Sequence, residues 1–198
     1  MIWPTCIALD DEDNIYLSDE NLQRITKYDR EGNPVTYWGE QGSGEGQFDQ
    51  PSGLLIRGDN ILVVDSRNNR IQTYSLNGDF CNQWGGLGTK DGEFNLPWGI
   101  CEDSKGYVYV ADWRNDRIQK FTFEGSHLAT FGESGKGEGQ LNRPAGVAID
   151  PDGNMYIADW GNQRLQVLDS EGRFLEVQRG EAGLNPWSIE YLSSQDDE

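Results

Sequence analysis

The stretch YVYVADWRNDRIQKF, residues 107–121, decides the fold of this chain, because its pattern occurs three more times. The other copies are NIYLSDENLQRITKY at 14–28, NILVVDSRNNRIQTY at 60–74 and NMYIADWGNQRLQVL at 154–168, so successive copies start 46 or 47 residues apart. Each copy places two runs of β-branched and aromatic residues on either side of a polar turn, which is the pattern of a β-hairpin. Self-similarity at this period indicates a repeat architecture.

Two more short strands complete each unit. In the third unit they are expected at residues 96–100, before the hairpin, and at 127–131, after it. Gly-containing turns such as Asn77-Gly78 favour tight antiparallel connections between the strands. A four-stranded meander cannot bury both of its faces alone, so neighbouring sheets must stack around a channel. The sequence therefore predicts an all-β fold, a β-propeller of which about four blades are present.

A proline opens each unit, and the prolines set the unit boundaries. These residues are Pro4, Pro51, Pro97, Pro144 and Pro186. We expect one propeller domain over residues 1–198, with units at about 1–47, 48–94, 95–141 and 142–184, a partial fifth unit at 185–192 and an acidic tail at 193–198.

Four motifs of these units resemble the NHL repeat. They are the Pro-x-Gly-Ile opening, the Tyr-Val-Ala-Asp strand, the Asn-x-Arg-Ile turn and the glycine-rich linker that ends in Gln-Leu. The resemblance covers nearly the whole chain and implies part of a six-bladed propeller of the TolB-like superfamily. This sequence departs from the family in its turns, where Gln23, Asn69, Asp116 and Gln163 replace the family's histidine. Leu22 also stands where the other units have asparagine, so we expect the first turn to differ in shape.

An open arc of blades leaves the side of a blade uncovered. Because propellers of this family commonly have six blades, the resemblance implies that the ring is completed by further blades or by a partner. We expect this chain to be the C-terminal part of a longer protein, or to close its ring by self-association. A closed four-bladed ring is the third alternative.

The chain is strongly acidic, with a formal net charge of −18. Nucleic-acid affinity comes largely from lysine and arginine, so we expect no nucleic-acid partner. No apolar run is long enough for a membrane span, so we expect no membrane partner. Cys6, Cys81 and Cys101 are widely spaced, and we interpret them as small buried apolar residues rather than as a disulfide framework or a zinc site. The compartment stays unknown.

The strand order predicts which loops share a face of the propeller. The linkers between units and the turns between second and third strands lie at one end, here called the upper face, and the other turns form the lower face. Tryptophan and arginine gather in the upper turns, as is typical of binding hot spots, although each tryptophan could instead only cover the end of its blade. The candidate ligand-binding residues are Trp98, Trp113, Arg114, Asn115, Trp160, Asn162, Trp187, Arg67 and Asn68.

Each unit also places an aspartate five residues before an arginine. Across a tight turn the two side chains can form a charge-assisted pair that fixes the hairpin. Because the pair repeats in every unit, a structural role is favoured over a catalytic one. The pairs are Asp19 with Arg24, Asp65 with Arg70, Asp112 with Arg117, and Asp159 with Arg164.

Three other motifs have ordinary structural interpretations. The glycine-rich linkers at 42–48 and 135–141 lack the helix and the Lys-Ser or Lys-Thr pair of a phosphate loop. The turn at 150–154 stops short of a complete calcium loop. His127 is the only histidine, is expected on an outer strand, and cannot by itself form a zinc site.

These observations predict a non-enzymatic binding or scaffold module that holds a protein, a peptide or a small polar ligand without a cofactor. The alternative is a hydrolase or lyase with a divalent cation in the central channel, where Glu102 and Glu190 could supply carboxylates. No nucleophile with its base is recognisable, so we assign no catalytic and no metal-binding residue. RNA binding, known for some NHL propellers, is disfavoured by the charge.

Overall fold

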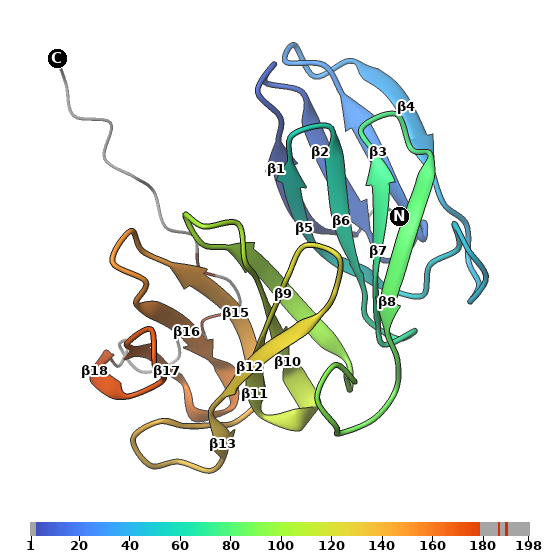
Figure 1. Ribbon diagram of the computed structural model, residues 1–198. Coiled ribbons are helices and arrows are strands. Elements are labelled where there is room, and N and C mark those ends of the chain that lie inside the picture. The colour runs from blue at the N-terminus through green and yellow to red at the C-terminus, as the bar shows by residue number, and fades with distance from the viewer. Residues whose placement is uncertain (1–2, 179–185, 187–188, 190–198) are drawn as a thin grey trace, which may run out of the picture.

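The computed structural model describes residues 3–178, 186 and 189, which form four four-stranded antiparallel sheets, here called blades 1 to 4 (Figure 1). Blade 1 contains β1 (Pro4–Leu9), β2 (Ile15–Asp19), β3 (Arg24–Tyr28) and β4 (Pro34–Trp38). Blade 2 contains β5 (Pro51–Arg57), β6 (Asn60–Asp65), β7 (Arg70–Ser75) and β8 (Phe80–Gly85). Blade 3 contains β9 (Pro97–Glu102), β10 (Val108–Asp112), β11 (Arg117–Phe121) and β12 (His127–Phe131). Blade 4 contains β15 (Pro144–Ile149), β16 (Met155–Asp159), β17 (Arg164–Leu168) and β18 (Phe174–Gln178).

Strands pair in chain order within every blade, which confirms the predicted all-β meanders. The fifth unit at 185–192 and the tail at 193–198 lie outside the described residues, apart from Pro186 and Ile189. No helix among the described residues is both long and apolar enough to cross a membrane.

Two kinds of short element go beyond the sequence prediction. The single 3-10 turns η1 (Trp113–Asn115) and η2 (Trp160–Asn162) connect the second and third strands of blades 3 and 4. Each is followed by a left-handed residue, Asp116 or Gln163, which turns the chain into the third strand. A parallel pair of two-residue strands, β13 (Glu133–Ser134) and β14 (Gln140–Leu141), lies within the linker to blade 4.

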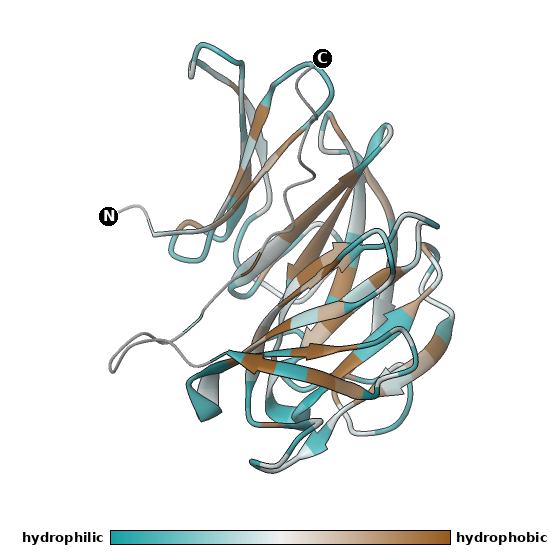
Figure 2. Ribbon diagram, turned by 90° about the vertical axis from the view of Figure 1, so that its left-hand side faces the viewer, coloured by the Kyte–Doolittle hydropathy of each residue, from teal (hydrophilic) through white to brown (hydrophobic). Residues whose placement is uncertain are grey.

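The apolar core lies between the blades. Three clusters of buried side chains fill the spaces between successive blades, and hydrophobic segments follow the strands while the turns are hydrophilic (Figure 2). Phe48, Phe94 and Leu141, each at the end of a linker, are fully buried. Because each sheet buries its faces against its neighbours, no blade is independently stable.

The first strands of successive blades are neighbours, β1 of β5, β5 of β9 and β9 of β15 (Figure 1). A Cβ atom on Gly53 would lie 2.6 Å from the carbonyl oxygen of Trp98, and one on Gly99 would lie 2.7 Å from that of Ala145. The Pro-x-Gly opening therefore reflects a close approach of backbones that a side chain would block.

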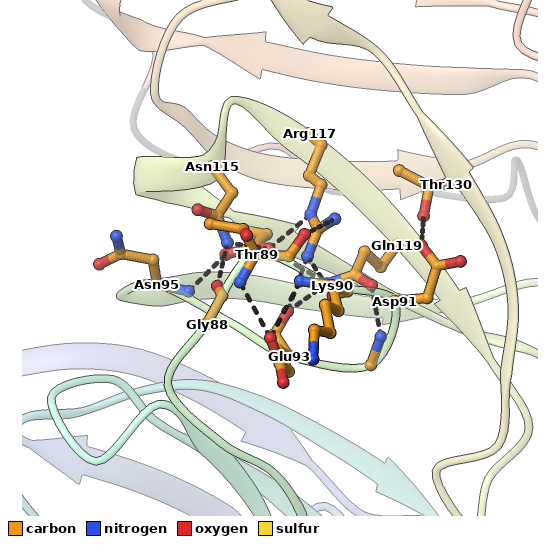
Figure 3. Close-up of polar contacts among 12 residues, drawn as sticks. Gly88, Thr89, Lys90, Asp91, Glu93, Asn95, Asn115, Arg117, Gln119 and Thr130 are labelled. Carbon is orange, nitrogen blue, oxygen red and sulfur yellow. Dashed lines mark hydrogen bonds and ion pairs between the residues drawn. The ribbon is translucent and has the colours of Figure 1, made fainter.

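A buried ion pair holds each linker against the blade that it enters. In blade 3, Arg117 Nε donates to Asp112 Oδ2 at 2.8 Å. Figure 3 shows Arg117 beside the linker residues Thr89, Lys90 and Glu93. The remaining nitrogens of the guanidinium donate to the linker carbonyl oxygens of Thr89, Lys90 and Glu93. We call this arrangement the linker seat.

Two amide side chains complete the linker seat of blade 3. Asn115 Nδ2 and Gln119 Nε2 both donate to Asp112 Oδ2, at 2.9 and 3.1 Å. The same two nitrogens donate to linker carbonyl oxygens, those of Gly88 and Glu93. One carboxylate therefore orients three side chains that together fix the path of the linker.

Blades 2 and 4 repeat the linker seat, with Arg–Asp distances of 2.8 Å for Arg70–Asp65 and 2.7 Å for Arg164–Asp159. Blade 1 does not, so the predicted pair of Asp19 with Arg24 is wrong. Arg24 makes no ion pair with a described residue, and its guanidinium instead lies 4.5 Å from the ring centre of Tyr37.

Burial raises the pKa of Asp65 and Asp112, and hydrogen bonds from backbone N–H groups, asparagine and arginine oppose that rise. Both carboxyl groups are wholly shielded from solvent. The guanidinium is thus the main compensating charge for a carboxylate in a poorly solvated place.

Blades 1, 2 and 3 are also tied to the next linker by the residue at the family's histidine position. A side-chain oxygen there accepts the N–H of the residue before the next opening proline. The bonds run from Gln50 to Gln23 Oε1 (2.7 Å), from Leu96 to Asn69 Oδ1 (2.8 Å) and from Arg143 to Asp116 Oδ1 (2.7 Å). An acceptor is what the position needs, which explains why three different residue types serve.

In blades 1, 3 and 4 an aspartate caps the hairpin between the first and second strands. In blade 4, Asp150 accepts hydrogen bonds from the backbone and side chain of Asn154, both at 2.8 Å, and from Tyr156 Oη at 3.3 Å. Burial alone would raise the pKa of Asp150, but these bonds lower it overall. The carboxylate of this turn is therefore occupied by its own hairpin.

The interpretation of all three cysteines as buried is wrong for Cys81. Cys81 is exposed because it lies on β8, the outermost strand of its blade, which no further strand covers. Cys6 and Cys101 are half-buried on the first strands β1 and β9.

Replacement of Arg117 by methionine should lower the free energy of unfolding by about 3–5 kcal/mol, because it leaves Asp112 buried without a counter-charge. Arg24→Met is the matched control, and its loss should stay near 1 kcal/mol, as for one cation–π contact. Urea unfolding of both variants measures the difference. Arg117→Lys, which keeps a cation beside Asp112, should lose less stability than Arg117→Met; equal losses for Arg117→Met and Arg24→Met would contradict the linker seat.

Replacement of Asp150 by asparagine should destabilise the chain most near neutral pH. The folded pKa of Asp150 lies below its unfolded value, so its contribution is present above the unfolded pKa and is lost as pH falls through the folded pKa. The difference in melting temperature between wild type and Asp150→Asn should therefore shrink below about pH 4. Thermal melts across pH would contradict this if the difference stayed constant.

Candidate ligand-binding face

The linkers and the second-to-third-strand turns meet on the upper face, as the strand order predicts. Asn115 in the turn of blade 3 reaches the carbonyl oxygen of Gly88 in the linker at 2.8 Å, and Asn162 in blade 4 reaches that of Gly135 at 2.9 Å. Turn and linker therefore form one continuous surface, held in place by the linker seats.

Two tryptophans and two arginines meet on this surface where blades 3 and 4 adjoin. The ring centres of Trp113 and Trp160 lie 6.0 Å apart with planes tilted by 49°. The guanidinium of Arg143 lies 5.1 Å from the ring centre of Trp113, and that of Arg114 lies 5.8 Å from it. Both rings are half-buried and both arginines are exposed. We call these four residues the Trp–Arg cluster.

The local fold explains how the two rings come together. Trp113 opens η1 and Trp160 opens η2, so each follows the buried aspartate of its linker seat directly. Arg143 is held by its backbone bond to Asp116, which follows η1. The cluster is therefore positioned by the same hydrogen bonds that join blade 3 to blade 4.

The other candidate residues are placed differently. The side chains of Asn68, Asn115 and Asn162 belong to the linker seats, where their amides bind an aspartate and a linker carbonyl oxygen. Arg67 is exposed in the turn of blade 2, and Trp98 is half-buried at the start of β9. Trp187 lies outside the described residues.

Arg143 was not among the candidate ligand-binding residues. It precedes the opening proline of blade 4, and the sequence signal was its place at the inner end of an upper-face linker. Its stacking on Trp113 joins residues 30 positions apart in the chain, 143 against 113, so only the tertiary structure shows it.

A cavity of about 480 Å³ lies along the first strands and is lined mainly by aliphatic side chains. Glu102 also lines it, with one carboxylate oxygen 3.9 Å from Arg57 Nε. Burial raises the pKa of Glu102, and Arg57 opposes that rise. Glu190, the second carboxylate considered for a channel site, lies outside the described residues.

Within the part of the chain that the structure describes, no three His, Cys, Asp or Glu side chains come together as a metal-binding set. His127 lies on the outer strand β12, as expected, and its Nε2 is 2.9 Å from Thr130 Oγ1.

Residues 94–121 and 141–168 match the family model of the NHL repeat. No curated protein matches the chain in sequence. Among solved structures, a streptogramin B lyase is similar with a TM-score of 0.72 and 15% identity, over 94% of this chain and 58% of that one. A catalytically inactive virginiamycin B lyase from Staphylococcus aureus with quinupristin has a TM-score of 0.69 and 15% identity, over 92% of this chain and 57% of that one.

A protein of unknown function from Bacteroides caccae is also similar, with a TM-score of 0.71 and 18% identity, over 94% of this chain and 71% of that one. At such identities the likeness shows the fold alone. The chain spans less than two-thirds of the length of either lyase. The chain contains NHL repeats in blades 3 and 4, and its four blades correspond to roughly half of a six-bladed β-propeller.

Proposed function

We propose that this propeller is a non-enzymatic binding module that holds a protein, a peptide or a small polar ligand on its upper face. The Trp–Arg cluster is the centre of the proposed site. The observation that carries the proposal is a difference between the four blades. Blades 3 and 4 have Trp113 and Trp160 directly after the repeated aspartate, whereas blades 1 and 2 have Glu20 and Ser66 at that position.

The comparison between blades separates function from folding. Ser66 in blade 2 is buried, and its hydroxyl donates to the carbonyl oxygen of Pro97 in the next blade. A small polar residue thus satisfies the fold at this position. The fold therefore does not need the half-buried tryptophans that blades 3 and 4 have at this position. Large aromatic residues beside arginine are typical of binding hot spots.

The linker seats hold the backbone of the Trp–Arg cluster in place, which favours ligand binding without rearrangement of these turns. The backbones of Trp113 and Trp160 follow directly on linker seats whose aspartates, Asp112 and Asp159, are fully buried. A surface that is already ordered loses little conformational entropy when a ligand binds.

The cavity gives less support to a catalytic function. Among the described residues that line it, Glu102 is the one carboxylate, and burial raises the pKa of the adjacent Cys101 thiol, which makes that thiol a poor nucleophile. Hydrolysis or elimination needs a positioned acid–base pair, and these residues do not form one.

Peptides selected from a random display library on the immobilised chain should depend on the Trp–Arg cluster. Combining Trp113→Ser with Trp160→Ser should weaken their binding at least tenfold, because a hot-spot residue contributes about 2 kcal/mol or more. Calorimetric titration measures the affinities, and Lys105→Ser on the lower face is the control. Serine is tolerated at the equivalent place in blade 2, so the melting temperature should change little.

The proposal fails if the selected peptides bind the double variant as tightly as the wild type. It also fails if hydrogen exchange shows that bound peptides protect only the lower face.

A further inference from the structure

The exposed cations of the upper face lack carboxylate partners in the described part of the chain, although the chain carries a net charge of −18. Five exposed side chains there form no ion pair with any described residue. They are Arg67, Lys90, Arg114, Lys136 and Arg143. A cation without an ion-pair partner can form a charge-assisted hydrogen bond with a carboxylate of a ligand.

Cations toward the lower face are paired instead. Lys27 lies 3.7 Å from Asp10, Arg57 3.9 Å from Glu102, Lys120 3.2 Å from Asp103 and Arg173 2.6 Å from Asp169. Lys105 is the exception, exposed in the lower turn of blade 3 without an ion pair among the described residues. The contrast between the faces follows from side-chain placement, since both faces carry many acids.

Carboxylates beside the cluster are engaged by the fold. Asp116 accepts the N–H of Arg143 at 2.7 Å and the hydroxyl of Ser134 at 2.6 Å. Glu93 accepts the N–H groups of Thr89 and Lys90, at 3.1 and 3.0 Å. Neither carboxylate forms an ion pair with a described arginine or lysine of the upper face. The guanidinium groups of Arg114 and Arg143 therefore remain able to pair with carboxylates of a ligand.

The geometry of the Trp–Arg cluster favours a ligand that carries an aromatic side chain as well as carboxylates. A guanidinium stacked on an indole keeps the N–H groups at its edge available for a carboxylate. The rings of Trp113 and Trp160 are half-buried, so part of each indole is exposed and can contact an aromatic side chain of a ligand. Both kinds of group lie within one small patch.

We propose, on the basis of the binding function above, that the Trp–Arg cluster recognises an acidic peptide in which an aromatic side chain lies between carboxylates. The aromatic side chain packs on the two tryptophans, and the carboxylates pair with Arg114 and Arg143. A short peptide fits better than RNA because Glu45 and Glu138 on the linkers, together with the net charge, repel an extended polyanion.

The test uses the whole chain and a fluorescein-labelled peptide of sequence Glu-Asp-Trp-Asp-Glu, titrated by fluorescence anisotropy. Two control peptides replace its acids by Gln and Asn, or its Trp by Ser. The protein variants combine Arg114→Glu with Arg143→Glu, and the matched control is Lys105→Glu on the lower face. Melting temperatures establish that each variant is folded.

We expect the acidic Trp peptide to bind, and each control peptide to bind about tenfold more weakly, which corresponds to about 1.4 kcal/mol. The double arginine variant should lose at least as much affinity, while Lys105→Glu should retain it. Higher ionic strength should weaken binding, because the paired charges are exposed to solvent.

Equal binding of the uncharged peptide would overturn the acidic specificity. The binding function would survive that result if the affinity still depended on Trp113 and Trp160. Absence of binding by all three peptides would also overturn this inference, and the library selection would then decide the binding function separately. Tighter binding of a single-stranded RNA dodecamer at the same two arginines would replace the peptide by a nucleic acid.

Discussion

The buried pair of an aspartate and an arginine is the interaction on which this architecture depends. In blades 2, 3 and 4 the aspartate orients the arginine, and the arginine binds carbonyl oxygens of the linker that enters its own blade. A propeller has few contacts between blades other than side-chain packing, so the path of each linker decides how the next sheet is placed. One polar network therefore fixes both the hairpin and the spacing of the blades.

The same network explains why the upper face can carry specificity. Its turns and linkers are irregular backbone, which would be mobile without the bonds that the linker seats supply. Once these loops are fixed, individual positions can vary without loss of the fold, as Glu20, Ser66, Trp113 and Trp160 do at one repeated position. Repetition thus provides an internal comparison: features that the blades share support the structure, and the fold does not require those that only blades 3 and 4 have.

Several features were predictable because they depend on local sequence. Alternation within strands, the Gly-containing turns and the repeat period led to the four meanders and to the common face of linkers and turns. Other features depend on contacts between units and were not predictable. Arg24 lies on Tyr37 instead of pairing with Asp19, and the asparagines of the turns serve the linker seats. Cys81 is exposed because its strand is outermost, a fact that composition cannot convey.

The sequence by itself determined the repeat, the four-stranded units and the class of fold, since strand propensity and turn chemistry act over neighbouring residues. The tertiary structure alone decided which side chains of the upper face lie together. Arg143 reaches Trp113 only because blades 3 and 4 pack side by side, and Trp113 meets Trp160 for the same reason. The physical cause is that stacking of sheets sets distances between units, whereas local sequence sets distances only within them.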